Sequence, residues 1–254
     1  MDFFKYQATG NDFILIDDRL NKFKIDNNYI KKLCDRKYGI GADGLILFRN
    51  HKDYDFEMIY FNSDGFESTM CGNGGRCIVS FANYLDPKIS NFTFNAIDGV
   101  HTGYINDKNL ISISMKEVDM FKKYDDMLYL DTGSPHIVKL VTNLNQINVK
   151  NDGYIIRNLN EFKKDGVNVN FLEIIDNNIF IRTYERGVEN ETLSCGTGAV
   201  AGALYAHQNN LVSESTVEIN SLGGKLYISF SYENNKYNNI NLCGEASLIF
   251  KGEI

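Results

Sequence analysis

Several absences in the sequence exclude large classes of protein. Its 254 residues contain no apolar run near the roughly 20 residues that a membrane-spanning helix needs, so no membrane partner is expected. Lysine and arginine number 26 against 33 aspartate and glutamate, for a net charge of -7. Because these cations are scattered and form no basic patch, no nucleic-acid partner is predicted. Only two prolines and no low-complexity tract interrupt a chain that is 43% hydrophobic, which favours packed cores.

Export and zinc signals are missing as well. The first residues, MDFFKYQATGNDF, show no basic segment followed by an apolar core, so no signal peptide is expected. An odd number of cysteines without an export signal indicates reduced thiols and predicts a cytoplasmic location. Cys71 and Cys77 lack the short spacing of common zinc ligands, and no matching Cys/His pair follows, so no metal is predicted. The five cysteines are Cys34, Cys71, Cys77, Cys195 and Cys243.

A short cysteine motif occurs twice. Residues 67–75 read ESTMCGNGG and residues 191–199 read ETLSCGTGA. Aligned on Cys71 and Cys195, both copies have glutamate four residues earlier, glycines one and three residues later, and then a small-residue stretch of helical character. Such glycines let backbone N–H groups converge at a helix N-terminus, which attracts anions and favours a thiolate. Two matched cysteines predict a site with a sulfur on each side.

Other segments of the second half repeat the order of the first half. A turn before a strand at 130–141 matches TGNDFILI, with Ser134 in the place of Asn11. Residues 165–174 correspond to the GADGLILF region, and residues 178–187 correspond to MIYFNSDG. Four segments that recur in one order predict a duplicated unit with pseudo-twofold symmetry. A site between two such halves receives equivalent groups from both.

The repeat predicts two domains, residues 1–117 and 118–244, with a C-terminal strand at 245–254 able to return to the first. The charged segment 117–127 lacks a clear period and is interpreted as the passage between the halves. A helix is predicted at 28–37, with Ile30, Leu33 and Cys34 on one face. Alternating segments after the first cysteine helix predict a strand meander, and NLCGEASLIF is predicted to be one strand.

Eight sequence blocks follow one another along the chain: GNDF (10–13), CDRKYGIGADG (34–44), FNSDG (61–65), MCGNGGRC (70–77), GSPH (133–136), NVNF (168–171), YERG (184–187) and ETLSCGTG (191–198). In this order they closely resemble the diaminopimelate epimerase family over nearly the whole chain. The resemblance implies an α+β fold of two pseudo-symmetric domains, each a β-barrel-like sheet wrapped around a central helix, with the active site in the cleft between them. It implies an isomerase that interconverts LL- and meso-diaminopimelate without pyridoxal phosphate or another cofactor, for lysine and peptidoglycan synthesis. It also implies a homodimer.

The two cysteines suit the inversion of an α-carbon. A proton must leave one face of that carbon, and another proton must arrive on the opposite face. Cys71 and Cys195 can act as thiolate base and thiol acid and exchange these roles in the reverse direction. The developing negative charge on the substrate carboxylate needs preorganised donors. The resemblance assigns this role to the helix N-termini, at Gly72, Asn73, Gly196 and Thr197.

The resemblance adds further site residues. It marks His136 and Glu185 as groups that tune the two thiols, since a nearby imidazole or carboxylate changes the favoured protonation state. Glu185 can also pair with the substrate ammonium. Arg186 has the planar fork that suits a bidentate contact with the distal carboxylate of a long diamino diacid. Neutral donors and acceptors at the turns are expected from Asn11, Asn62, Ser134 and Asn168.

The chain departs from the family pattern at three places. Many relatives carry glutamine where this chain has Gly44, and asparagine where it has Ser134. The family often ends in a valine-tyrosine pair whose tyrosine helps to form the dimer, and here Ile249 and Phe250 keep the ring without the hydroxyl. The first two departures bear on substrate identity, and the third bears on the dimer.

Structural roles are predicted for the remaining reactive side chains. Buried, inert thiols are expected at Cys34, Cys77 and Cys243. Surface or structural histidines are expected at His51, His101 and His207, and loop caps at Glu67 and Glu191.

Three alternative functions remain open from the sequence. A related cofactor-independent amino-acid racemase, for example one acting on histidine, would have the same two thiols, although Arg186 favours a second carboxylate. A Cys-His hydrolase with Cys71 as the acylating nucleophile explains neither the second cysteine nor the duplication. A non-catalytic binding protein on this fold would have no reason to keep both cysteines.

Overall fold

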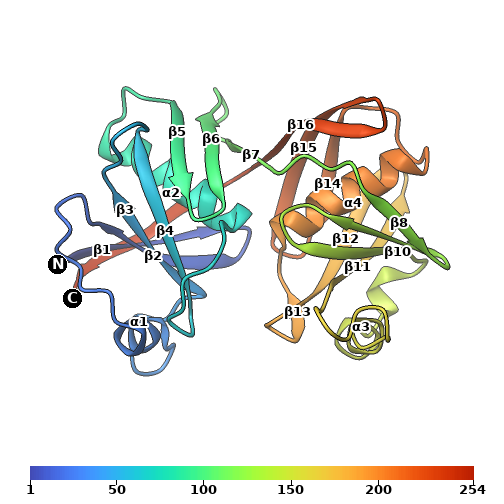
Figure 1. Ribbon diagram of the computed structural model, residues 1–254, viewed down its shortest axis with the longest axis horizontal. Helices are drawn as coiled ribbons and strands as arrows, with labels where there is room; N and C mark the ends of the chain where they lie inside the picture. The colour runs from blue at the N-terminus through green and yellow to red at the C-terminus, as the bar shows by residue number, and fades with distance from the viewer. The chain divides into compact units, whose positions relative to one another are not determined.

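The computed structural model describes residues 1–254, whose contacts divide the chain into two compact units. The first unit comprises Met1–Ile113 and Cys243–Ile254, and the second comprises Ser114–Leu242. Both combine strands with two α-helices (Figure 1). The C-terminal segment therefore packs with the N-terminal residues. The two ends of the chain lie side by side, and the Met1 ammonium donates to the Ile254 carbonyl at 2.6 Å.

Antiparallel and parallel pairs alternate in the sheet of the first unit. Strands β1 and β2 are antiparallel, β2 and β3 parallel, β3 and β4 antiparallel, β4 and β5 parallel, and β5 and β6 antiparallel. The last strand, β17, pairs antiparallel with β1. The elements are β1 (Asp2–Ala8), β2 (Asn11–Asp17), α1 (Asn27–Cys34), β3 (Gly44–Arg49), β4 (Phe56–Asn62), α2 (Gly72–Leu85), β5 (Asn91–Ala96), β6 (Gly99–Ile105), β7 (Ile111–Ser114) and β17 (Ser247–Glu253).

The second unit has the same alternation of pairs. Strands β9 and β10 are antiparallel, β10 and β11 parallel, β11 and β12 antiparallel, β12 and β14 parallel, and β14 and β15 antiparallel. The predicted duplication is thereby confirmed. The elements are β8 (Phe121–Tyr124), β9 (Met127–Asp131), β10 (Pro135–Leu140), a 3₁₀ turn (Leu144–Gln146), α3 (Val149–Arg157), β11 (Asn168–Ile175), β12 (Asn178–Glu185), β13 (Asn190–Thr192), α4 (Gly196–Gln208), β14 (Thr216–Ser221), β15 (Gly224–Glu233) and β16 (Lys236–Gly244).

Each unit encloses the helix that follows its cysteine. Helix α2 contacts β1, β2, β3, β6 and β17, and α4 contacts β9, β10, β11, β12, β14 and β15 (Figure 1). A helix with strands on several sides has to be apolar or small around its whole circumference. Helix α4 meets this need with the sequence GTGAVAGALYAH, of which Ala199–Ala206 are all buried. Neither these helices nor the two others are long and apolar enough to cross a membrane.

Helix α1 is shorter than the sequence predicts. It begins after Asp26, whose side chain accepts the Tyr29 N–H at 2.8 Å, and its last residue is Cys34 rather than residue 37. The Asp35 carboxylate accepts the N–H groups of Lys37 and Tyr38, and such local side-chain bonds compete with helical ones. The predicted apolar face is confirmed, because Ile30, Leu33 and Cys34 are buried in the core of the first unit.

Three further segments differ from the sequence predictions. The charged stretch 117–127 contains β8, whose mostly polar and charged side chains hide the strand period. Helix α3 was not predicted, and it contains Asp152-Gly153, a pair typical of turns. A Cβ atom at Gly153 would lie 2.4 Å from the Tyr184 Cβ, so packing against β12 requires the glycine. NLCGEASLIF, predicted as one strand, is divided between β16 and β17.

Candidate active site

Both cysteines of the repeated motif are the N-cap residues of a buried helix. Cys71 precedes α2 with φ −92° and ψ 130°, and Cys195 precedes α4 with φ −120° and ψ 114°. Their carbonyl oxygens accept the first helical hydrogen bonds, from Gly75 at 2.7 Å and Ala199 at 2.9 Å. Neither thiol caps its helix. The first-turn N–H groups and the helix dipole therefore offer one anion site beside each sulfur.

Strand ends bring two predicted site residues of the first unit and Gly44 to one edge of its sheet. Asn11 is the first residue of β2, and Gly44 is the first residue of the parallel strand β3. Asn62 is the last residue of β4 and lies opposite Gly44 in the antiparallel pair. The equivalent edge of the second unit has Asn168 at the start of β11 and Glu185 at the end of β12.

A chain of amide hydrogen bonds connects Asn11 to Cys71. The Cys71 thiol donates to Asn11 Oδ1, with the sulfur 3.7 Å from the oxygen. The same oxygen accepts from Asn73 Nδ2 at 3.2 Å, and Asn11 Nδ2 donates to Asp43 Oδ2 at 2.6 Å. The structure thus brings together three of the predicted residues, with Asp43 as a support that the sequence analysis missed.

Asp43 belongs to a cluster of charges behind Asn11. Arg36 Nη2 lies 2.7 Å from a carboxylate oxygen of both Asp12 and Asp43, and Lys5 Nζ lies 2.8 Å from Asp12. Burial alone would raise the pKa of Asp12, but the hydrogen bonds from Arg36 and Lys5 outweigh it and hold that pKa well below its usual range. The cluster therefore keeps the acceptor of the Asn11 amide in a fixed place.

Tyr60 occupies the space beside Gly44. Its hydroxyl donates to Asn62 Oδ1 at 2.7 Å, so the ring holds a predicted substrate-binding residue. A Cβ atom at Gly44 would lie 2.6 Å from Tyr60 Cε2 and 2.5 Å from the Phe61 carbonyl oxygen. A side chain at this position would displace the tyrosine. Many relatives have glutamine at position 44, whereas here glycine stands beside the Tyr60 ring. The sequence analysis did not identify Tyr60.

In the second unit a neutral network leads from Cys195 to His136. The sulfur lies 3.4 Å from Thr197 Oγ1, which lies 2.9 Å from His136 Nε2. Asn170 Nδ2 lies 3.0 Å from His136 Nδ1, and Asn170 Oδ1 accepts from Thr183. Because Asn170 donates to Nδ1, the imidazole proton lies on Nε2 and is donated to Thr197. His136 therefore reaches the thiol through Thr197.

His136 is a neutral member of this network near pH 7. The side chain is fully buried, and burial lowers its pKa to about 3. Among the charges around it, Asp131 opposes this shift and Arg186 adds to it. His136 is thus a hydrogen-bond donor beside Cys195 rather than a cation.

His136 also predicts how stability depends on pH. Its pKa is about 3 in the folded protein and about 6.5 in an unfolded chain. Below about pH 6.5 the unfolded state binds the proton first, so the free energy of unfolding falls as pH decreases towards 3. The linkage amounts to about 2 kcal/mol between neutral pH and about pH 5. Urea unfolding followed by circular dichroism at both pH values will measure it. His136→Gln is expected to lose this amount of pH dependence, and equal losses in both proteins would contradict the assignment.

Arg186 and Asn168 organise the remaining predicted residues of the second unit. The Arg186 backbone N–H donates to Asn168 Oδ1 at 2.8 Å, and Asn168 Nδ2 donates to Ser134 Oγ at 2.9 Å. The exposed guanidinium of Arg186 donates to the Asp165 carbonyl at 2.9 Å and forms no ion pair with a carboxylate. Its planar fork can therefore take an external carboxylate.

The other reactive side chains have structural surroundings. Burial raises the pKa of Cys34 to about 12 and also raises the pKa of Cys77 and Cys243. Two of the remaining histidines have close partners, since His207 Nδ1 lies 2.7 Å from the Tyr237 hydroxyl and His101 lies 3.5 Å from Asp98. These thiols and imidazoles are accounted for within the fold. No three His, Cys, Asp or Glu side chains form a possible metal site.

The two matched glutamates differ from each other in the structure. Glu191 forms a two-point ion pair with Arg182, at 2.6 and 2.7 Å. Arg182 also donates to the Leu144 and Ile147 carbonyls, so this pair fastens a loop. Glu67 is exposed and has no ion pair.

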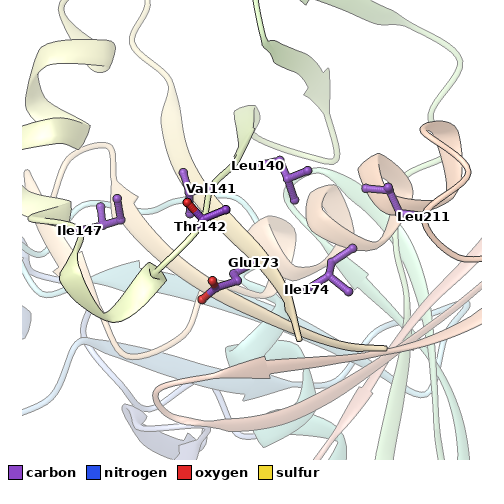
Figure 2. A pocket seen from close by; sticks show the side chains of 7 residues that line it. All are labelled: Leu140, Val141, Thr142, Ile147, Glu173, Ile174 and Leu211. Atoms are coloured by element: carbon purple, nitrogen blue, oxygen red, sulfur yellow. The ribbon is translucent and has the colours of Figure 1, made fainter. Parts of the chain in front are cut away.

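An open hollow of about 680 Å³ in the second unit lies away from this chemistry (Figure 2). It lies near the end of α4 where Leu211 follows the helix, whereas Cys195 precedes the other end, about 20 Å away at 1.5 Å per residue. The Glu173 carboxylate in the hollow already accepts the N–H groups of Asn143 and Leu144. The lining residues are Leu140, Val141, Thr142, Ile147, Glu173, Ile174 and Leu211.

Sequence comparisons identify relatives of this chain whose names are known. A model of the family described as diaminopimelate epimerase matches residues 3–118 and 128–249. A diaminopimelate epimerase of Flavobacterium psychrophilum is 49% identical over 256 residues, with all of both chains covered. A diaminopimelate epimerase of Chlorobaculum tepidum is 40% identical, with 97% of this chain and 98% of the relative covered.

Solved structures share the fold at low sequence identity. A Bacillus anthracis phenazine biosynthesis protein of the PhzF family superposes with a TM-score of 0.75 at 17% identity, covering 100% of this chain and 98% of the other. A hydroxyproline epimerase from Agrobacterium vitis, with bound trans-4-hydroxy-L-proline, has a TM-score of 0.69 at 12% identity, covering 100% and 90%. These likenesses support the two pseudo-symmetric domains and say nothing about the substrate.

Proposed function

The chain belongs to the diaminopimelate epimerase family, and we propose that it converts LL-2,6-diaminopimelate to the meso form by inverting one α-carbon. One observation supports this reaction above all others. Two equivalent helices each begin directly after a cysteine whose thiol makes no capping hydrogen bond to the first turn. A proton-transfer group and an anion site are thus present twice, as inversion of a carbon next to a carboxylate requires.

In the proposed reaction Cys71 and Cys195 lie on opposite faces of the substrate α-carbon. One sulfur, as thiolate, removes the α-proton, and the other sulfur, as thiol, delivers its proton to the opposite face. The first-turn groups of Gly72, Asn73, Gly196 and Thr197 are proposed to hold the α-carboxylate as its charge grows. Amides at helix N-termini are already oriented for this role, so they need no reorganisation during the reaction.

The remaining predicted residues have proposed roles around the substrate. His136 tunes Cys195 through Thr197, which lies within hydrogen-bond distance of both side chains. Glu185 is proposed to tune a thiol or to pair with the substrate ammonium, and Arg186 to bind the distal carboxylate. Polar contacts with the rest of the substrate are proposed for Asn11, Asn62, Ser134 and Asn168.

The cellular setting is also a proposal. We infer a cytoplasmic enzyme that serves lysine and peptidoglycan synthesis and that needs no cofactor, since the two thiols supply both proton transfers. A homodimer is supported by β17, which exposes the apolar side chains of Leu248, Ile249 and Phe250. A group of neighbouring exposed apolar side chains is a candidate interface.

A racemase for an amino acid with one carboxylate is the second candidate. It would use the same thiols and helix N-termini, and the Tyr60 side chain beside Gly44 changes the surroundings of Asn62 relative to the family pattern. Arg186 favours the diacid, because its exposed guanidinium has no carboxylate partner within the chain.

The decisive assay compares both substrates in deuterated water. Purified protein, without added cofactor, is expected to convert LL-diaminopimelate to the meso form and to place one solvent deuteron on the inverted α-carbon. L-Histidine, supplied at the same concentration, is expected to remain unchanged. Chiral chromatography with mass spectrometry measures both outcomes. Turnover of histidine without turnover of diaminopimelate would replace the proposed function by the racemase.

A further inference from the structure

Arg76 is a buried cation within the first two turns of α2. Its side chain is 0% exposed. Nη1 donates to the Gly72 carbonyl at 3.2 Å, and Nη2 donates to Thr9 Oγ1 at 3.2 Å and to Asn73 Oδ1 at 2.9 Å. Nε donates to the Glu245 carbonyl at 3.4 Å. Every partner is a neutral oxygen, and no carboxylate pairs with this guanidinium.

A buried charge without a counterion is costly, so its presence indicates a use. Burial lowers the pKa of Arg76, yet a guanidinium keeps its proton in proteins. Its ionisable neighbours are the three thiols Cys71, Cys77 and Cys243. Burial raises the pKa of Cys77 and of Cys243, which therefore stay neutral. Cys71, at the N-cap, is the thiol whose ionisation would balance the charge.

Other charged groups on the elements around α2 already have partners or face solvent. This leaves Arg76 as the unbalanced charge at this helix end. Glu245 contributes only its carbonyl and has no ion pair with Arg76. The other groups are the Lys5–Asp12, Arg49–Asp18 and Arg19–Asp17 ion pairs, His101 beside Asp98, Lys251 beside the Tyr84 hydroxyl, and the exposed Asp2 and Glu253.

Arg76 also determines how the Asn73 amide is oriented. Because Nη2 of Arg76 can only donate, it faces the Asn73 oxygen and directs the Asn73 nitrogen towards Asn11 Oδ1. The same Asn11 oxygen accepts from Cys71 while that thiol is protonated. This contact opposes ionisation of the sulfur, so the Arg76 charge has to outweigh it. Removal of the guanidinium would let the Asn73 amide rotate, and the contacts of Asn11 and Cys71 would change with it.

Helix α4 has no cation at the position equivalent to Arg76. The position equivalent to Arg76, five residues after the cysteine, is the buried Val200. The Thr197 hydroxyl lies next to Cys195 and contacts the neutral His136 in turn. Two helices that are equivalent in the fold therefore differ by one buried positive charge.

We propose that Arg76 is a positioning residue that orients Asn73 and Asn11 and makes Cys71, rather than Cys195, the thiolate of the free enzyme. The proposal rests on the proposed function, because it assigns starting roles to the two bases. Cys71 Sγ takes the α-proton, and Cys195 Sγ–H gives its proton to the opposite face. Each turnover leaves a Cys71 thiol and a Cys195 thiolate. Before the next turnover in the same direction, Cys71 returns its proton to solvent and Cys195 takes one up.

Alkylation of the free enzyme by iodoacetamide tests this assignment, since the thiolate is the reactive form. The rate at each cysteine is followed against pH by mass spectrometry of the separate peptides. In the wild-type protein the pH midpoint for Cys71 is expected to lie at least about one unit below that for Cys195. Midpoints, unlike rates at one pH, are insensitive to the exposure of the sulfur. Equal midpoints, or a lower one at Cys195, would overturn the proposal without any variant.

Arg76→Met removes the charge, and Arg19→Met is the matched control that removes an exposed arginine of the same unit. Arg76→Met is expected to raise the Cys71 midpoint by about one unit and to leave Cys195 unchanged. Arg19→Met is expected to move neither midpoint. An unchanged Cys71 midpoint in Arg76→Met, or equal shifts at both cysteines, would show that the Arg76 charge does not favour the Cys71 thiolate.

Arg76→Lys separates the charge from its geometry and serves as the second variant if Arg76→Met does not fold. It keeps a cation but loses the planar fork, so the low Cys71 midpoint is expected to remain while KM rises several-fold. A wild-type KM would overturn the positioning of Asn73 and Asn11. Alkylation needs no turnover. If the protein shows the expected midpoints but does not epimerise diaminopimelate, the proposed function fails and this inference holds. If it epimerises diaminopimelate without showing the expected midpoints, the proposed function holds and this inference fails.

Discussion

Cys71→Ala and Cys195→Ala are each expected to lower kcat for epimerisation by about 10²- to 10⁴-fold, the usual contribution of one general acid or base. Each substitution removes the proton-transfer group from one face of the α-carbon and leaves the other face intact. Inversion needs both groups, because a single base tends to return a proton to the face from which it was taken. Neither thiol caps its helix, so the helices themselves should form normally in both variants.

Isotope exchange distinguishes this loss from general damage. In deuterated water each variant should still exchange the α-proton of the one stereoisomer whose C–H bond points to the remaining sulfur. The two variants should therefore exchange opposite stereoisomers without inverting them. Cys34→Ala is the control, because this buried thiol lies in the core of the first unit, and its kcat is expected to stay within about twofold of wild type. Inversion at a wild-type rate in either site variant would contradict the two-base mechanism.

Mild oxidation is expected to abolish activity completely through a disulfide between Cys71 and Cys195. Two sulfurs that serve one carbon from opposite faces come close to each other when no substrate lies between them. A disulfide then needs only a small further approach, because its geometry places the two Cβ atoms roughly 4 Å apart. Reductant should restore activity fully, since no sulfinic acid is formed. Bound substrate should protect the enzyme by occupying the gap.

Peptide mapping of the oxidised protein decides between the possible disulfides. The expected product is a single cross-link between the Cys71 and Cys195 peptides, which reductant removes. Cys195→Ala, oxidised in parallel, should yield no intramolecular disulfide at Cys71. A dominant Cys71–Cys77 link in the wild-type protein, or none that includes Cys195, would mean that the two cysteines do not share a site.

The sequence by itself determined the features that depend on neighbours along the chain. A cysteine followed by glycines and a small-residue stretch predicts a helix N-terminus, and Cys71 and Cys195 are the N-caps of α2 and α4. The repeated order of four segments predicted the duplication, which the two units confirm through the same alternation of strand pairs. Turn residues and helix caps act within a few residues, so their effect is visible in the sequence. The roles of the individual site residues stay proposals.

Only the tertiary structure decided which buried polar side chains form the hydrogen-bond networks next to the two cysteines. Arg76 contacts Thr9, which lies 67 residues earlier, and Asn170 contacts His136, which lies 34 residues earlier. Neither arginine nor asparagine is expected in a core from its residue type, and both are buried because strands from distant segments supply their hydrogen-bond partners. Packing likewise made α3 possible at Gly153, against a turn-like sequence. Burial and long-range hydrogen bonding depend on which segments the sheet brings together, and no local pattern of residues encodes that choice.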